Sequence, residues 1–174
     1  MLEPAYFYQN ELNDCMKKVS MNKDLYFYFM YPTKFYSILL DNNESDSLQY
    51  VSKDSKGNIL GYFAAYIGHD DNHIKNLDMI NFSNSINIVF SKDAIKFLDK
   101  IFLEKKFRKV IFYTIADNPA VKIYRKLIKK FNGREVGCLK NEKLLTDGTY
   151  HDEIIFEIFL CDYIKNTKKR SALI

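Results

Sequence analysis

A nearly continuous apolar run, VIFYTIA at residues 110–116, constrains the fold of this chain more than any other stretch. The run is rich in β-branched residues and suits a central strand that is buried on both faces. Asn118 and Pro119 follow it; Asn is a favoured helix cap and Pro a favoured first helical residue. The segment therefore predicts a strand followed directly by a helix, and a helix between single strands implies a crossover connection.

The chain before this run divides into a helical part and a strand-rich part. Apolar spacing, caps and prolines predict helices over 4–19, from 22 or 24 to 32, and over 32–43, followed by strands over 48–52, 59–67 and 76–82. A connection over residues 84–90 then leads to an amphipathic helix, which Ser91 is predicted to cap and which runs to about residue 105.

The chain after the run predicts one helix and a closing hairpin. The helix after Asn118 ends at Asn132-Gly133, a pair that supplies a left-handed stop. The last two strands are predicted over 134–140 and 149–160, joined around Asp147-Gly148. The sum is an α/β (α+β) fold with a mixed, mostly antiparallel central sheet and helices on both faces.

Length and cysteine usage bound the class of protein. A chain of 174 residues suggests one domain, and no apolar run approaches the roughly 20 residues that cross a bilayer. The first residues, MLEPAYFYQNELND, lack a basic segment followed by an apolar one, so we expect no signal peptide and no membrane partner. Cys15, Cys138 and Cys161 lack CxxC spacing and are expected to be reduced thiols of a cytoplasmic protein, with a disulfide pair as the alternative.

The formal charge is +4, and basic residues gather over 104–109, 122–130 and 165–170. One interpretation is attraction to a polyanion, either a nucleotide cofactor or nucleic acid. The other is a solvated helix face and a basic, disordered tail over 165–174. Because the basic residues of the helix alternate with core positions, we expect no nucleic-acid partner.

Three segments together carry a resemblance to a known family. The first is the strand, elbow and helix in MINFSNSINIVFSKDAIKFLDKIF. The second is VIFYTIADNPAVKIYRKLIKKF, in which Ala120 precedes the helical Tyr124 by four positions, and the third is the closing hairpin DGTYHDEIIFEI. In order and spacing, these segments resemble the GNAT N-acetyltransferase superfamily over residues 48–162.

The resemblance implies one acyl-CoA N-acyltransferase-like domain over residues 1–164. Residues 48–162 are then its cofactor-binding core, and the helical region over 1–45 is its acceptor side. Acetyl-CoA is the implied acyl donor, with its pyrophosphate at the elbow and its pantetheine arm along a strand end. The residues implied in cofactor binding are Ile80, Phe82, Ile88, Val89, Phe90, Ser91, Lys92 and Asn118.

The elbow departs from the family pattern Q/R-x-x-G-x-G/A. In its place stands INIVFS (86–91), with neither Arg nor Gln, and with Val89 where the first glycine belongs. A helix start offers unpaired amides and partial positive charge, so an anion can bind there without glycine if the backbone keeps ordinary φ. Lys92 adds positive charge, whereas Asp93 opposes an anion. The alternative is a capped helix start with Val89 and Phe90 packed into the core.

The resemblance also implies catalytic roles. Tyr124 occupies the family's position for the proton donor to the departing thiolate, and a phenol with a pKa of about 10 suits that task. Asp78 lies on the strand that often carries the base, with His151 and Asp152 as alternatives. Each also has a structural interpretation: Tyr124 as a core aromatic, the acids and His151 as solvated surface residues.

Other candidate sites are weaker. Asn118 explains itself as a helix cap without any cofactor. The stretch HDDNH (69–73) has metal-capable side chains but lacks the helical scaffold of HExxH, so we expect no metal site.

The leading hypothesis is therefore a small cytoplasmic N-acetyltransferase that moves an acetyl group from acetyl-CoA to an amine of a small molecule or peptide. The alternative is a non-catalytic GNAT-like binding module with a degenerate cofactor loop, whose partner is a protein or nucleic acid. A homodimer is compatible with either hypothesis. The sequence leaves the acceptor, the base and the oligomeric state open.

Overall fold

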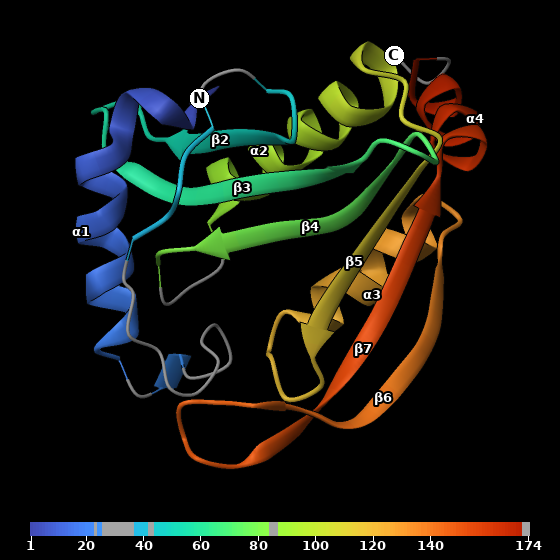
Figure 1. The fold of residues 1–174 in the computed structure, drawn as a ribbon. Helices are drawn as coiled ribbons and strands as arrows, with labels where there is room; N and C mark the ends of the chain where they lie inside the picture. Colours follow the sequence, from blue (N-terminus) through green and yellow to red (C-terminus); the bar gives the residue numbers. More distant parts are fainter. Residues whose placement is uncertain (23, 26–36, 42–43, 84–86, 172–174) are drawn as a thin grey trace.

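A seven-stranded sheet organises the chain in the computed structural model, which describes all residues except 23, 26–36, 42–43, 84–86 and 172–174 (Figure 1). The strands are β1 (Leu2–Pro4), β2 (Ser47–Lys53), β3 (Ile59–Gly68), β4 (His73–Asn81), β5 (Lys109–Ile115), β6 (Arg134–Leu144) and β7 (Tyr150–Phe159). They lie in the order β1-β2-β3-β4-β5-β7-β6, and β4–β5 is the parallel pair among antiparallel ones. The predicted mixed, mostly antiparallel sheet is confirmed.

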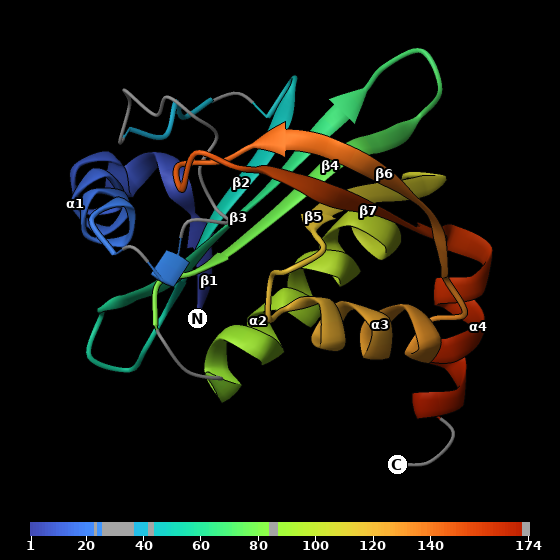
Figure 2. The ribbon, with the colours of Figure 1, turned by 90° about the horizontal axis from the view of Figure 1, so that it is seen from below.

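Helices cover both faces of the sheet, as predicted (Figure 2). They are η1 (Ala5–Tyr8), α1 (Gln9–Ser20), α2 (Ile88–Asp99) with a π-helical turn η3 (Lys100–Glu104), α3 (Val121–Lys130) and α4 (Leu160–Ser171). Helix α1 lies on one face, and α2 and α3 lie on the other. In the described part of the chain, no helix is both long and apolar enough to span a membrane.

Strand alternation divides the core between the two faces. On β3, Tyr62 and Ala64 pack with Leu12 of α1, whereas Phe63 and Ala65 pack with Phe97 of α2. Successive side chains of a strand point to opposite faces, so this one strand feeds both cores. The larger core holds aromatic residues of α2, η3, β5, β7 and α4.

The apolar run over 110–116 forms a central strand, β5, between β4 and β7. Val110 and Phe112 are buried against the helices, as predicted. The prediction that both faces are buried is wrong at Tyr113, which is 39% exposed. Tyr113 lies beyond the point where β5 stops pairing with β4, so its side chain is left partly uncovered.

The C-terminal segment is helical rather than disordered, which corrects the prediction for the tail over 165–174 up to Ser171. Tyr163 anchors α4: its ring is fully buried between Phe102 and Phe131, at centroid distances of 4.6 and 4.4 Å. Its hydroxyl donates to the Asp99 carboxylate at 2.7 Å. Two stacked rings and this hydrogen bond hold the helix start, and the basic turns then extend from it.

The third predicted helix, over 32–43, is wrong where the structure describes it. Residues 37–41 have no regular structure and cross the face that carries α1. Side chains from α1 and β2 form hydrogen bonds with the main chain of this segment. Gln9 donates to the Ile38 carbonyl at 2.8 Å, and Gln49 donates to the Leu39 carbonyl at 2.8 Å. These bonds replace helical ones. The rest of this prediction, and most of the one over 22–32, lies outside the described residues.

A glycine sets how closely α2 approaches the sheet. The ring of Phe90, in the first turn of α2, stacks on Phe63 with centroids 4.7 Å apart and lies directly over Gly61 of β3. A Cβ atom on Gly61 would lie 2.3 Å from this ring and 2.4 Å from the Ile80 carbonyl oxygen. Because one of these neighbours is main chain, a side-chain rotation cannot make room for it.

We expect Gly61→Ala to lower the free energy of unfolding by about 1–3 kcal/mol, because it forces the ring and the neighbouring strand apart. Urea unfolding followed by circular dichroism measures this change. Gly137→Ala is the matched control, since a Cβ atom there meets nothing within 4 Å. Equal stabilities of the two variants would contradict this account of the packing.

Candidate functional site

The parallel strands β4 and β5 are paired only at their beginnings. His73 lies opposite Lys109 and Ile74 opposite Val110, and the pairing stops there among the described residues. Beyond these two pairs the strands diverge into a V (Figure 1). Each strand keeps its other neighbour, β3 or β7, along its length. The inner edges of the V therefore leave main-chain donors and acceptors without a strand partner.

A cavity of about 730 Å³ occupies the V. Its walls come from β3, β4, β5, the first turns of α3 and the β6–β7 hairpin. The lining residues include Tyr66, Asp78, Met79, Ile80, Tyr113, Thr114, Asn118, Tyr124, Lys143, Leu145 and Glu153. Four residues that the resemblance singled out, Asp78, Ile80, Asn118 and Tyr124, thus converge on one cavity.

The cavity has walls on both sides of the sheet. Met79 and Tyr124 pack with the core on the helical face of α2 and α3. Tyr66 and Ile80 pack with the core on the face of α1. Asp78 lies opposite Ala64 of that second core, so its side chain is on the α1 face. Two molecules entering from opposite faces can therefore meet in the gap between β4 and β5.

Asp78 is a carboxylate in a poorly solvated position. Desolvation raises its pKa above the usual range, although hydrogen bonds from Asn76 and Tyr66 oppose the shift. The Asn76 amide donates to Asp78 Oδ1 at 2.9 Å. Burial, followed by the charge of Asp78, raises the pKa of Tyr66 to about 12, so this phenol stays protonated and available as a donor. A carboxylate of raised pKa in a cavity has the properties of a general base.

Tyr124 packs against the core and also lines the cavity. Its ring packs edge-on against Phe112 and Phe156, at centroid distances of 5.5 and 6.2 Å, as a core aromatic does. The same residue lines the cavity from the α3 side. The packing fixes the ring without sealing it off, so its structural interpretation does not exclude the chemical one.

Asn118 holds the turn that aims α3 at the cavity. Its carboxamide oxygen accepts the Ala120 amide at 2.8 Å, and its main-chain amide donates to the Ile115 carbonyl at 3.0 Å. The helix proper begins at Val121, two residues later than predicted, because Pro119 and Ala120 belong to this turn. Asn118 is buried and lines the cavity, so its capping role leaves its place in the wall intact.

The start of α2 differs from its prediction. Asn87, not Ser91, caps the helix: its carboxamide oxygen accepts the amides of Val89 and Phe90 at 2.9 and 3.1 Å. Ser91 lies in the first turn instead, and its hydroxyl donates to the Asn87 carbonyl at 2.9 Å. Two of the amides expected to cradle an anion are therefore already paired within the chain.

The side chains of this helix start fit neither interpretation completely. Ile88 and Val89 are 70% and 40% exposed, so they are not core residues, whereas Phe90 packs on the sheet. Lys92 is exposed. None of the predicted anion-binding residues over 88–92 lines the cavity. Phe82 does not line it either: it packs beside α1, and its amide donates to the Leu60 carbonyl.

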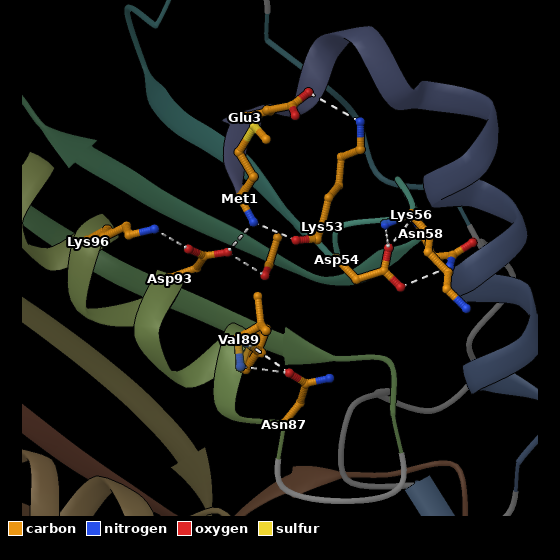
Figure 3. Close-up of polar contacts among 12 residues, drawn as sticks. Met1, Glu3, Lys53, Asp54, Lys56, Asn58, Asn87, Val89, Asp93 and Lys96 are labelled. Carbon is orange, nitrogen blue, oxygen red and sulfur yellow. Dashed lines mark hydrogen bonds and ion pairs between the residues drawn. The ribbon is translucent and has the colours of Figure 1, made fainter.

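Asp93 anchors α2 to the sheet, a role that sequence reasoning missed (Figure 3). Its carboxylate is 1% exposed and accepts the Ser52 hydroxyl at 2.8 Å and the Lys96 ammonium at 2.9 Å. The Met1 amine lies 3.0 Å away. Burial alone would raise the pKa of Asp93, but these partners lower it below its usual range. The carboxylate is thus charged and satisfied, and it does not oppose an anion as an isolated charge would.

The two alternative base candidates are held in ion pairs. Asp152 accepts the Lys140 ammonium at 2.5 Å and the Asn141 amide at 2.9 Å. These hydrogen bonds lower its pKa. His151 lies between two carboxylates: Nδ1 is 2.8 Å from Asp117 and Nε2 is 2.8 Å from Asp147. A neutral imidazole donates from one nitrogen only, so this geometry belongs to the imidazolium.

No protein-family model and no curated protein matches this sequence. Solved structures match its fold. The spermidine N-acetyltransferase of Vibrio cholerae in complex with CoA and spermine has a TM-score of 0.69 at 19% identity, over 94% of this chain and 97% of that one. A GCN5-related N-acetyltransferase from Brucella melitensis has a TM-score of 0.67 at 17% identity, over 98% of this chain and 80% of that one.

This chain has the GNAT fold. The match extends over nearly the whole of both chains, so it includes α1 and the closing hairpin as well as the region over 48–162 that carries the resemblance in sequence. In the terms of the GNAT fold, β4 and β5 are the strands that splay, and α2 follows the elbow. At identities below 20%, the likeness extends to the fold and not to individual residues.

His151 makes a testable link between pH and stability. Desolvation opposes its charge, but the hydrogen bonds to Asp117 and Asp147 raise its pKa above the usual value. A raised pKa means that the stabilisation is fully present below about pH 6.5 and is lost as the pH rises through the folded-state value.

We therefore expect His151→Gln to lower the melting temperature at pH 6 and to have a smaller effect at pH 9. Differential scanning calorimetry across this range measures it. His69→Gln is the control, because His69 pairs with a single, exposed carboxylate, Asp46. A melting-temperature difference that does not change with pH would show that His151 is not charged in the fold.

Proposed function

We propose that this protein transfers the acetyl group of acetyl-CoA to an amine. The observation that carries the proposal is the cavity between β4 and β5, which brings Tyr124 and Asp78 together from opposite faces of the sheet. The solved structures of the same fold support it, since one is a spermidine N-acetyltransferase in complex with CoA and spermine.

The residues present fit a coenzyme A group in two places. The inner edges of the V offer unpaired main chain to a pantetheine arm, which carries amides of its own. The start of α2 offers a pyrophosphate the amides of Val89 and Phe90 once the Asn87 side chain rotates away, with Lys92 exposed nearby. Bound acetyl-CoA supplies the acetyl group as a thioester, with the coenzyme thiolate as leaving group.

The chain's own groups then move two protons. Asp78 accepts the proton that the amine loses, directly or through a water, so that the nitrogen lone pair becomes nucleophilic. Its raised pKa brings it closer to that of the group it deprotonates. Tyr124 donates its hydroxyl proton to the departing sulfur, and the second proton that the nitrogen loses as the amide forms restores the phenol, directly or through a water. The edge contacts of its ring with Phe112 and Phe156 hold the phenol in place for this transfer.

The acceptor in this proposal is a cationic amine of a small molecule or peptide. An ammonium is attracted to Asp78 before it is deprotonated, and the neighbour that binds spermine has such an acceptor. We propose a cytoplasmic location for this enzyme. The second candidate is a GNAT-like binding module without catalysis, which the self-capped start of α2 favours.

Cofactor binding distinguishes these two candidates. Asn87→Gly removes the carboxamide that occupies the Val89 and Phe90 amides, and Gly at a cap costs a helix only a few tenths of a kcal/mol. We expect this variant to bind acetyl-CoA about five- to tenfold more tightly than the wild type, as the gain of about 1 kcal/mol from one freed hydrogen bond implies. Isothermal titration calorimetry measures both affinities.

Asn87→Asp is the matched control: it keeps the cap but adds a negative charge at the helix start, so it should bind acetyl-CoA more weakly than the wild type. If neither the wild type nor Asn87→Gly binds the cofactor at millimolar concentration, the enzymatic proposal fails and the binding module is the better description.

Tyr124→Phe tests the proposed acid. The ring contacts remain and the proton is lost, so we expect kcat to fall about a hundredfold or more, with little change in KM for acetyl-CoA. Release of coenzyme A thiol, followed with a chromogenic disulfide, measures the rate. Tyr113→Phe is the control, because Tyr113 lines the same cavity from the opposite face of β5. An equal loss in the two variants would remove Tyr124 from the mechanism.

A further inference from the structure

A second carboxylate lies in the cavity and has no role in the mechanism above. Glu153 is on β7, is 8% exposed and lines the cavity. Among the described residues, the polar contact that the structure gives its carboxylate is with Lys143 Nζ, at 3.6 Å. At this distance the two groups form an ion pair, but they are too far apart for a hydrogen bond. Burying a carboxylate without hydrogen bonds is costly, so the position is unfavourable unless something else satisfies it.

Glu157, four residues further along the same strand, is a carboxylate of this sheet with close cationic partners. It points to the same face, is 4% exposed, and pairs with Arg134 at 2.5 Å and Lys109 at 3.2 Å. Burial works against it, but the two cations lower its pKa. Burial likewise raises the pKa of Glu153, and Lys143 does not reverse the shift. Glu153 thus has one distant cation where Glu157 has two close ones.

The position of Glu153 relative to Asp78 indicates which further cation can approach its carboxylate. Glu153 is paired with Ile115 of β5, and its side chain lies on the same face as Tyr113, away from α3. Asp78 lies on β4, on the other side of the gap from β5, and its side chain is on the α1 face as well. Asp78 and Glu153 therefore line the same cavity on one face of the sheet, with β5 and the gap between them.

We propose that Glu153 binds a second ammonium group of the acceptor, so that the cavity selects linear di- and polyamines over monoamines. This inference rests on the proposed function for the identity of the reacting amine at Asp78. An extended aliphatic amine bridges the two carboxylates along the α1 face, with one nitrogen at the reacting position and the other at Glu153. The aliphatic part then lies against Tyr113, Ile80 and Leu145, which line the cavity.

Lys143 has a place in this arrangement. It reaches Glu153 from the end of β6, in the hairpin that forms the outer wall. In the absence of an acceptor it is the nearest cation to the carboxylate, at a distance that provides attraction without a hydrogen bond. A bound ammonium replaces it, so Lys143 competes with the acceptor. The other cation of the cavity, Lys75, is on β4 and has no contact with Glu153.

Two probe amines with different numbers of ammonium groups test the inference. Spermidine carries further ammonium groups, whereas butylamine has a single one. We expect Glu153→Gln to weaken spermidine binding about ten- to a hundredfold, the worth of a charge-assisted hydrogen bond, and to leave butylamine binding unchanged. Isothermal titration calorimetry with the full chain measures both, and a thermal melt confirms that the isosteric variant is folded. Lys143→Gln should tighten spermidine binding, because it removes the competing cation.

The kinetic readout separates Glu153 from the reacting end of the site. Glu153→Gln should raise KM for spermidine with kcat nearly unchanged, whereas Asp78→Asn should lower kcat for both amines. The inference is overturned if the wild type does not bind spermidine, if Glu153→Gln binds it as the wild type does, or if the variant weakens both amines equally. If spermidine binds through Glu153 but no acetyl transfer occurs with any amine, the proposed function fails and the second cation site stands.

Discussion

The parallel contact between β4 and β5 is the constraint on which the rest of the structure depends. Two residue pairs join the halves of the sheet, and everything beyond them diverges. A sheet opened in this way is stable only if side chains hold its closed end. They do: Ile74 and Val110, at the junction, are fully buried in the same core as Phe102 and Tyr163. The cavity between β4 and β5 therefore depends on the packing at the closed end, which fixes the two strands relative to each other.

The start of helix α2 is held in place by side-chain contacts, although the sequence before it lacks the glycines of the family pattern. Phe90 uses the space above Gly61, and Asp93 bonds Ser52 of β2, so the helix is fixed to the sheet at two points one turn apart. With the helix fixed, its free amides need an acceptor, and Asn87 provides one from the chain itself. Gly61 of β3 admits the Phe90 ring close to the sheet, whereas Val89 stands where the family pattern places its first glycine.

Much of the fold could be predicted from the sequence, and the failures have a common cause. The β-branched run before Asn118 predicted the central strand and the helix after it because those signals are local. Asn87 and Ser91 are both good caps four residues apart, and the choice between them depends on where Phe90 meets Gly61, a contact between residues 29 positions apart. The helix over the basic tail depends in the same way on Tyr163, which stacks on rings from η3 and the end of α3.

The candidate site likewise contains residues that the sequence could predict and one that it could not. Asp78, Ile80, Asn118 and Tyr124 were singled out by a resemblance in order and spacing, and they surround one cavity; their chemical roles remain predictions. Glu153 had no signal of its own, since an acidic residue in an alternating strand normally faces water. Only the pairing of β7 between β5 and β6 places it inside, and only the comparison with Glu157 shows that its carboxylate lacks a close cation.

The outer edge strands of the sheet affect how readily other chains can associate with this protein. One edge is β1, which is three residues long. The other is β6, which is long and exposed but has two register shifts against β7 and a positive φ at Asn141. Short, bulged and lysine-bearing edges resist the addition of a foreign strand. Among the described residues, the two outer edges of the sheet are therefore poor templates for a foreign strand, so strand addition there is unfavourable.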